Sequence, residues 1–218
     1  MNNKTVVKVA ENYLGVRKGS LFHHKIIDRF NNVKPDGYTA GYNDHWCAEF
    51  VSSCFIEAYG KKYAQKIMVL SASCGKMVEK AKAAGIWIEK DNYKPKAGDV
   101  ILYDWQDSGK GDNQGWPDHV GIVVNSNDTT IKVIEGNTTA VSQVAYRNIK
   151  INGRYIRGFI KPKFDKLPKE KKETNKTKIN KLADEVIAGK YGDGEKRKKA
   201  LGKYYDEVQK EVNRRLAK

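Results

Sequence analysis

A segment rich in proline and charge begins at Lys161 and divides this 218-residue chain into two unequal parts. Pro162 and Pro168 lie among closely spaced lysines, and the segment has few apolar side chains to bury, which is typical of a solvated linker. Aromatic and apolar residues are frequent before the segment, whereas charge dominates after it. We therefore predict a domain over residues 1–162, a Lys-rich linker over 163–178 and a small module over 179–218.

The larger part changes its apolar period from helical to extended about halfway along. Apolar residues at helical spacing, each time followed by a glycine, predict three helices, whereas short apolar runs between Gly, Asn and Asp predict strands. The predicted helices cover residues 6–14, 47–59 and 73–84, and the predicted strands cover 99–103, 119–125, 131–135 and 155–161. Helices followed by strands indicate an α+β fold, with N-terminal helices packed on a mainly antiparallel sheet.

The small module is predicted to form three short helices. Leu182, Val186 and Ile187 share one face of the first helix, and an apolar stripe from Tyr204 to Leu216 marks the last. Forty residues without a disulfide or a metal lie near the lower limit for independent folding. We therefore expect this module to be marginally stable on its own.

Several classes of protein are excluded by the composition. No apolar run approaches the roughly 18 residues of a membrane-spanning helix. Lys8 and Glu11 interrupt the N-terminus where a secretory signal peptide needs an apolar stretch. The three cysteines are odd in number and widely spaced, which fits neither a disulfide framework nor a paired zinc site. We expect a protein that is made in a reducing cytoplasm and keeps at least one free thiol.

The chain is strongly basic, with 41 Lys and Arg residues against 26 Asp and Glu residues and a formal net charge of +15. The excess is concentrated in residues 161–218, which hold 19 basic and 10 acidic side chains. Such a charge favours a polyanionic partner, and nucleic acid, anionic lipid and an anionic cell wall all meet that description.

Cys47 is the candidate nucleophile because it begins an amphipathic helix directly after a polar loop. The unpaired N–H groups and the helix dipole at such a position lower the pKa of a thiol and favour its thiolate. The alternative for any single cysteine is a buried structural role. That alternative fits Cys54, which lies in the apolar stripe of the helix, and Cys74.

A nucleophilic cysteine needs a base, and the chain has four histidines. His23 and His24 lie in a charged segment and are predicted to be at the surface. His119 begins a predicted strand, and from a strand edge it can face a helix N-terminus and accept a proton. Either Glu135 or Asn137, which share one face of the next strand by their spacing, can accept the second N–H group of the imidazole.

Five blocks in this order resemble a CHAP domain (cysteine, histidine-dependent amidohydrolase/peptidase). The blocks are WCAEFVS (46–52), PKAGDVILY (95–103), DHVGIV (118–123), IEGN (134–137) and RGFIKP (157–162). The resemblance covers about residues 1–162 and implies a papain-like α+β fold that cleaves amide bonds in peptidoglycan. It further implies that Cys47 is the nucleophile, His119 the base, Glu135 the orienting group and Asn137 a fourth polar member.

The tail resembles a second family, the three-helix wall-binding repeat of certain phage lysozymes, which recognises the glycan–peptide unit of peptidoglycan. The segments that carry this resemblance are LADEVIAGKYGDGEKR (182–197) and YDEVQKEVN (205–213). It implies substrate contacts by Tyr191 and Arg197. Tyr191 stands where the family usually has Trp, and the repeat is present in one copy where arrays are common. Both departures weaken the binding expected of the module.

Together the two resemblances imply a modular endolysin that hydrolyses an amide bond in the peptide part of the bacterial wall. The enzyme is either an N-acetylmuramoyl-L-alanine amidase or an endopeptidase that cuts within the stem peptide or the cross-bridge. Two other classes remain as alternatives. One is a papain-like cysteine peptidase or acyltransferase with a non-wall substrate. The other is a basic nucleic-acid-binding protein, although no basic–aromatic recognition motif is present.

The substrate groove is predicted to include His45 and two tryptophans, Trp105 and Trp116, which flank a polar loop. The backbone N–H of Cys47 is the expected oxyanion donor. No cofactor or metal is predicted, because the acidic and amide residues of the polar loop lack the ordered spacing of a calcium site. Those residues are Asp107, Asp112 and Asn113.

The expected partner is bacterial peptidoglycan in a Gram-positive wall, because anionic teichoic acids attract a basic protein. Neither nucleic-acid binding nor membrane insertion is expected, and the oligomeric state is left open. With no signal peptide visible, we expect synthesis in the host cytoplasm and action on the wall after release through a membrane pore.

Overall fold

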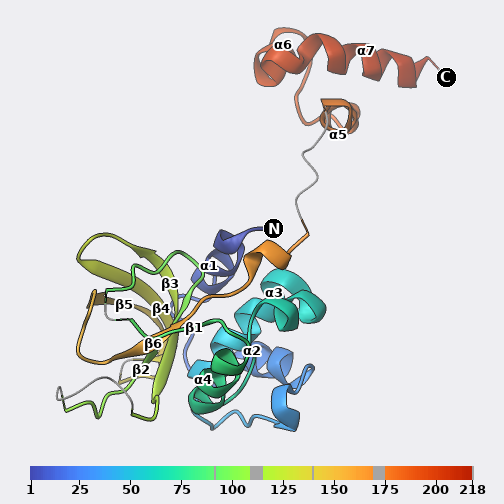
Figure 1. The fold of residues 1–218 in the computed structure, drawn as a ribbon. Coiled ribbons are helices and arrows are strands. Elements are labelled where there is room, and N and C mark those ends of the chain that lie inside the picture. The colour runs from blue at the N-terminus through green and yellow to red at the C-terminus, as the bar shows by residue number, and fades with distance from the viewer. Residues whose placement is uncertain (91, 109–114, 139, 169–174, 218) are drawn as a thin grey trace. The chain divides into compact units, whose positions relative to one another are not determined.

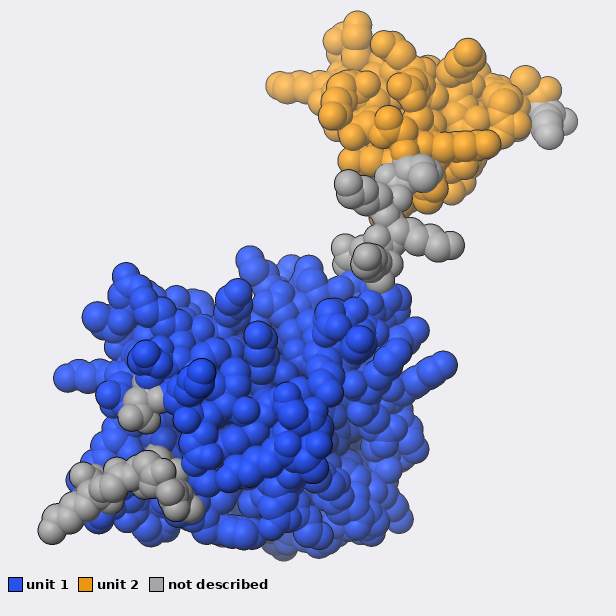
Figure 2. Space-filling view, in the orientation of Figure 1, with its two compact units in different colours: residues 1–168 blue, residues 169–218 orange. Residues whose placement is uncertain are grey.

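The computed structural model describes residues 1–90, 92–108, 115–138, 140–168 and 175–217. The chain divides into two compact units, Met1–Pro168 and Lys169–Lys218 (Figure 2). The first unit extends beyond the predicted boundary at residue 162, because Phe164 stacks on Phe55 with ring centroids 6.3 Å apart and Leu167 is buried in the core. The first helix of the second unit, α5 (Asn175–Ile187), begins inside the range that was predicted to be linker.

The described residues of the first unit form one antiparallel sheet in the order β1-β6-β2-β3-β4-β5. Its strands are β1 (Trp87–Ile88), β2 (Val100–Tyr103), β3 (His119–Ser126), β4 (Thr130–Thr138), β5 (Gln143–Lys150) and β6 (Ile156–Ile160). Four of them were predicted. Strand β5 was missed because it lies at the sheet edge and has few buried residues, and β1 because it has two residues.

Four helices lie on one side of this sheet (Figure 1). They are α1 (Asn3–Glu11), α2 (Leu21–Asn31), α3 (Cys47–Ile67) and α4 (Cys74–Ala83). Side-chain oxygens cap three of them, since Asn2, Ser20 and Ser73 each accept a backbone N–H of the first turn. The helical segment that begins at Cys47 ends at Gly60, as predicted, because Gly60 has a non-helical backbone with a positive φ of 73°, and a second segment of α3 continues to Ile67.

The start of α3 packs closely on the sheet. Phe50 and Phe55 are fully buried between the helix and the strands. Gly136 on β4 permits this approach, because a Cβ at that position would lie 2.6 Å from Cβ of Phe50. A second apolar cluster, which includes Tyr103 and Phe159, involves the sheet and its loops. The predicted α+β class is confirmed, and the closely packed helix is the one that begins at Cys47.

The second unit forms α5, α6 (Gly194–Leu201) and α7 (Tyr205–Leu216), in agreement with the predicted helical module. Its small core consists of Ala183, Val186, Leu201, Val208 and Val212. Among the helices of the described residues, none has the length and apolar character needed to cross a membrane.

Candidate active site

Cys47 is the first residue of α3, and this helix begins without a side-chain cap, unlike α1, α2 and α4. Trp46 occupies the N-cap position and makes no capping hydrogen bond. The N–H groups of the first turn are therefore available for other acceptors. The Cys47 side chain is buried, and the backbone N–H of Ala48 hydrogen-bonds to its sulfur.

The surroundings of Cys47 hold the pKa of its thiol well below the usual value. The largest cause is a hydrogen bond with the Cys74 thiol, followed by the hydrogen bond and charge of His119, while burial acts in the opposite direction. The pKa of Cys74 is raised well above its usual value, chiefly by the same contact. Cys74 therefore keeps its proton and donates a hydrogen bond to the Cys47 sulfur.

His119 begins β3 and is the partner of Cys47 on the sheet side. Its Nε2 lies 3.1 Å from Oε2 of Glu135, which leaves Nδ1 for the contact with the sulfur. Burial opposes the charged imidazole, but the hydrogen bonds to Cys47 and Glu135 outweigh it and raise the pKa of His119 to about 9. The lowered pKa of the thiol and the raised pKa of the imidazole both favour a thiolate–imidazolium pair.

Glu135 is fully buried on β4 and binds two cationic groups. Besides contacting His119, it accepts a hydrogen bond from Nε–H of Arg147, and this nitrogen lies 2.9 Å from both carboxylate oxygens. Burial raises the pKa of Glu135, but the hydrogen bond and charge of His119 and the charge of Arg147 hold it below its usual value. Arg147 also donates to Thr138 at 3.0 Å. The carboxylate is thereby fixed in its ionised form beside the imidazole.

Asn137 does not share the face of Glu135 as the spacing predicted. The pairing of β4 with β5 shifts between Glu135 and Thr138, and Asn137 adopts a left-handed φ of 55° at that irregularity. Its Nδ2 lies 3.3 Å from Nδ1 of His45, and Ser142 donates to its Oδ1. Of the two candidate acceptors for His119, the structure thus brings Glu135 into contact, while Asn137 orients His45.

Both predicted tryptophans lie close to the site. Trp105 stacks on Tyr103 at a centroid distance of 4.6 Å and lies 6.2 Å from the ring of His119. The Trp116 side chain is 65% exposed, and its ring covers Gly75, the residue after Cys74. Residues 109–114 of the polar loop, which include Asp112 and Asn113, lie outside the described residues.

Of the remaining residues, Cys54 agrees with the prediction and His23 does not. Cys54 is buried and burial raises the pKa of its thiol, as befits a structural cysteine. The surface position predicted for His23 is wrong, because His23 is fully buried on α2 against Trp46, at a centroid distance of 4.7 Å. Burial lowers the pKa of His23 to about 4. The charged neighbours of His23 in the sequence obscured the apolar face of its helix.

Sequence reasoning missed three residues that the structure places at the site, namely Cys74, Arg147 and Glu49. Cys74 contacts Cys47 from the next helix, and Arg147 contacts Glu135 from β5, the edge strand that the sequence did not predict, so no local pattern marks them. Glu49 lies on the first turn of α3 and is buried, although a charged residue at that position is expected to be exposed.

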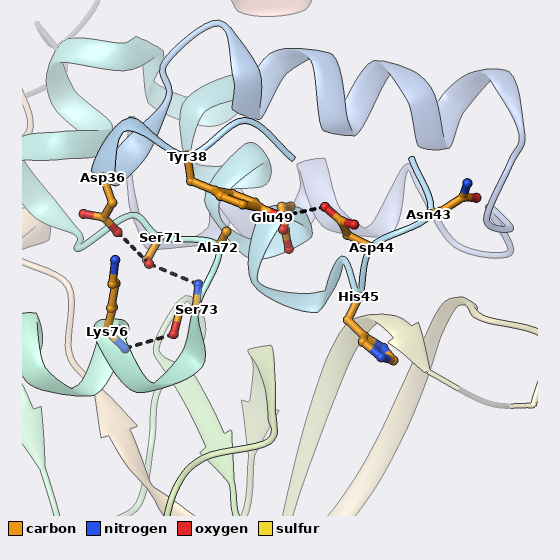
Figure 3. Close-up of a pocket in the computed structure, with 10 residues that line it drawn as sticks. All are labelled: Asp36, Tyr38, Asn43, Asp44, His45, Glu49, Ser71, Ala72, Ser73 and Lys76. Carbon is orange, nitrogen blue, oxygen red and sulfur yellow. Dashed lines mark hydrogen bonds between the residues drawn. The ribbon is translucent and has the colours of Figure 1, made fainter. Parts of the chain in front are cut away.

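A pocket of about 480 Å³ opens beside the start of α3 (Figure 3). It is lined by Asp36, Tyr38, Asn43, Asp44, His45, Glu49, Ser71, Ala72, Ser73 and Lys76. His45 and Glu49 flank Cys47 in the sequence, and Ser73 precedes Cys74. The pocket therefore lies beside the starts of α3 and α4, and its lining consists of neighbours of the two thiols rather than of Cys47 and Cys74 themselves.

In the second unit, Tyr191 and Arg197 make hydrogen bonds within the module. The Tyr191 hydroxyl donates to Glu185 at 2.6 Å. Arg197 donates to the Gly192 carbonyl at 2.9 Å, to Gln209 at 3.1 Å and to Asp193 at 2.6 Å. The guanidinium group thus ties the turn before α6 to α7.

Comparison with families of known proteins gives two matches. Residues 37–137 match the CHAP domain and residues 180–216 match the CW_7 repeat, a cell-wall repeat. The CHAP match contains Cys47, His119, Glu135 and Asn137 and ends before the RGFIKP block. No curated protein and no solved structure matches the chain.

Proposed function

The chain carries a CHAP domain and a CW_7 cell-wall repeat and is thus a peptidoglycan hydrolase, and on that premise we propose that it acts by cysteine nucleophilic catalysis. One observation carries this proposal. The Cys47 thiol lies at an uncapped helix start, in contact with an imidazole that a buried carboxylate holds from its other side. This is the arrangement of a nucleophile, a general base and an orienting group.

In the proposed reaction, the Cys47 thiolate attacks the carbonyl carbon of an amide in the peptide part of the wall. The backbone N–H of Cys47 at the uncapped start of α3 stabilises the oxyanion. The imidazolium of His119 gives its proton to the leaving amine, which departs and leaves a thioester on Cys47. His119 then takes a proton from water, and the resulting hydroxide releases the acyl group as a carboxylic acid.

In this scheme, Glu135 acts through His119 and Asn137 acts through His45. Glu135 fixes the orientation of His119 and stabilises its charged form, and Arg147 keeps Glu135 ionised. Asn137 is a positioning residue for His45 at the edge of the pocket. Trp105 and Trp116 are proposed to contact the substrate on either side of the two thiols.

The CW_7 repeat is proposed to hold the enzyme on the wall of a Gram-positive host, as in a modular phage endolysin. The net charge of +15 supports association with an anionic wall. Tyr191 and Arg197 are the proposed contacts of the repeat with peptidoglycan. Arg197 in addition shapes the turn that presents Tyr191.

Digestion of purified Gram-positive peptidoglycan by the wild type and by Cys47→Ala tests the proposal, with mass spectrometry of the soluble products. We expect products from the wild type alone. New stem peptides that begin at L-Ala identify an amidase, whereas split stems or cross-bridges identify an endopeptidase. Equal digestion by the Cys47→Ala variant contradicts the cysteine mechanism.

A further inference from the structure

Glu49 is a buried carboxyl group that the cysteine mechanism does not use. It follows Cys47 by two residues on α3, and it is 1% exposed. Among the residues that the structure describes, none forms a hydrogen bond with its Oε2. Because a buried polar atom without a partner lowers stability, such an atom beside a nucleophile indicates a place where a ligand supplies the missing partner.

Glu49 lines the pocket beside the start of α3, close enough to Cys47 for the charge of the thiolate to act on it. A second acidic residue, Asp44, lines the same part of the pocket (Figure 3). Asp44 accepts the Tyr38 hydroxyl at 2.7 Å and the Gly41 N–H at 2.7 Å. These two hydrogen bonds hold the pKa of Asp44 below its usual value, so that Asp44 is ionised at neutral pH. One end of the pocket thus combines a fixed negative charge with a carboxyl group that lacks a partner.

The lysines near the pocket act mainly on groups other than Glu49. Lys80 pairs with Asp36, whose carboxylate also accepts the Ser71 hydroxyl at 2.8 Å. Lys76 lines the pocket and contributes its charge to Asp36. Lys18 donates to the Asn43 carbonyl, and its charge also acts on Asp44 without an ion pair. Within the described part of the chain, no Lys or Arg forms an ion pair with Asp44 or Glu49. A cation bound between Asp44 and Glu49 would therefore meet a negative charge and an acceptor oxygen that lacks a hydrogen-bond partner.

We propose that this pocket binds a primary ammonium group of the peptide substrate, with Glu49 and Asp44 as its acceptors, next to the amide that Cys47 attacks. The inference rests on the proposed function and names a feature of its substrate. Burial, and then the charges of Cys47 and Asp44, raise the pKa of Glu49 to about 8, so the empty pocket holds a proton on this carboxyl group. A bound ammonium group supplies the positive charge in place of that proton.

The test compares two substrates and three forms of the full-length enzyme. Purified Gram-positive peptidoglycan is used untreated or after acetylation of its free amines with acetic anhydride, and initial rates are measured for wild type, Glu49→Gln and Glu79→Gln. Glu79 is the matched control because it is an exposed carboxyl residue of α4 that does not line the pocket. All three forms keep the second unit, so any effect of acetylation on wall binding is common to them.

We expect acetylation to slow the wild type and Glu79→Gln by about tenfold, the size of one charged hydrogen bond. Glu49→Gln is expected to digest both walls at similar rates, close to the wild-type rate on the acetylated wall. If Glu49→Gln also alters the Cys47 thiolate, the rates on the untreated and the acetylated wall change by the same factor. The ratio of these two rates therefore still measures whether the pocket recognises the ammonium group. Asp44→Asn provides a second variant with the same expected loss of preference.

Two results overturn the inference while the hydrolase assignment stands. One is a wild-type enzyme that digests both walls equally. The other is a Glu49→Gln variant that is as sensitive to acetylation as Glu79→Gln. If the wild type digests neither wall, the proposed function itself fails first.

Discussion

A carboxylate paired with cationic groups appears in both units, but its surroundings differ. In the first unit, Glu135 is fully buried between His119 and Arg147. In the second unit, Glu211 pairs with Arg214 and Arg215 of α7 and is 16% exposed, and hydrogen bonds from the two arginines lower its pKa to about 2. The partners shift both pKa values in the same direction, so the direction alone does not distinguish a catalytic group from a surface ion pair.

Solvent makes the difference between these two carboxylates. Solvent reaches Glu211 in part and Arg214 to 59%, so water and salt screen the Glu211 pairs, and screened ion pairs contribute little to stability. No water screens Glu135, so the loss of one partner leaves an uncompensated charge in the core. We therefore expect single substitutions to have large effects in the first unit and small effects in the second.

The largest effect is expected for His119→Ala. It removes both the base and the proton donor, and we expect wall digestion to slow by about 10⁴-fold. The wild type should lose activity as the pH rises through about 9, because His119 is charged below that pH and neutral above it. Turbidity loss of purified walls measures both effects. An active His119→Ala enzyme would show that another group accepts the proton.

A smaller loss, about 10²-fold, is expected for Glu135→Gln, because the base remains but loses its charged partner. The pKa of His119 falls in this variant, so the alkaline limb of the pH–rate profile moves to lower pH. Thermal unfolding checks whether the unpaired Arg147 destabilises the core. An unshifted alkaline limb would separate Glu135 from the chemistry and leave it a structural role.

Removal of residues 169–218 is expected to slow the digestion of intact walls by about tenfold and to leave the hydrolysis of soluble wall fragments unchanged. The reason is that the first unit has its own core and contains the whole proposed catalytic group. Wall pull-down and the two rate measurements test this. If the truncated enzyme fails on soluble fragments as well, the units are catalytically coupled.

Cys74→Ala should retain the chemistry but raise the pKa of Cys47, because it removes the thiol that donates to the thiolate. The rate of alkylation of Cys47 by iodoacetamide, followed against pH, measures this shift directly. Cys54→Ala is the matched control, since Cys54 is buried elsewhere in the core. Identical alkylation profiles for the two variants would contradict the assigned contact.

The smallest effect is expected for Glu211→Gln. Although this pKa is strongly lowered, the group is partly exposed and its pairs are screened, and we expect the unfolding midpoint at 0.15 M salt to be unchanged within error. Chemical unfolding of the full chain, followed by a signal from the second unit, measures this. A clear loss of stability would show that surface charge contributes more to this small module than the comparison suggests.

The sequence by itself determined much of the fold and the identity of the proposed nucleophile and base. Helical spacing and glycine stops predict the main elements, because these signals act between residues a few positions apart. Cys47 at a helix start and His119 at a strand start follow from the same local signals. Helix α2 was missed because a mixture of charged and aromatic residues hides its apolar face.

Tertiary structure decided which side chains meet at the site. An irregularity between β4 and β5 turns Asn137 toward His45 and leaves Glu135 to His119. Cys74 reaches Cys47 because the start of α4 meets the start of α3, and Arg147 reaches Glu135 because β5 pairs with β4, and no local spacing reveals either contact. The unpartnered carboxyl group of Glu49 likewise becomes visible once the pocket is formed, since burial is a property of the packed molecule.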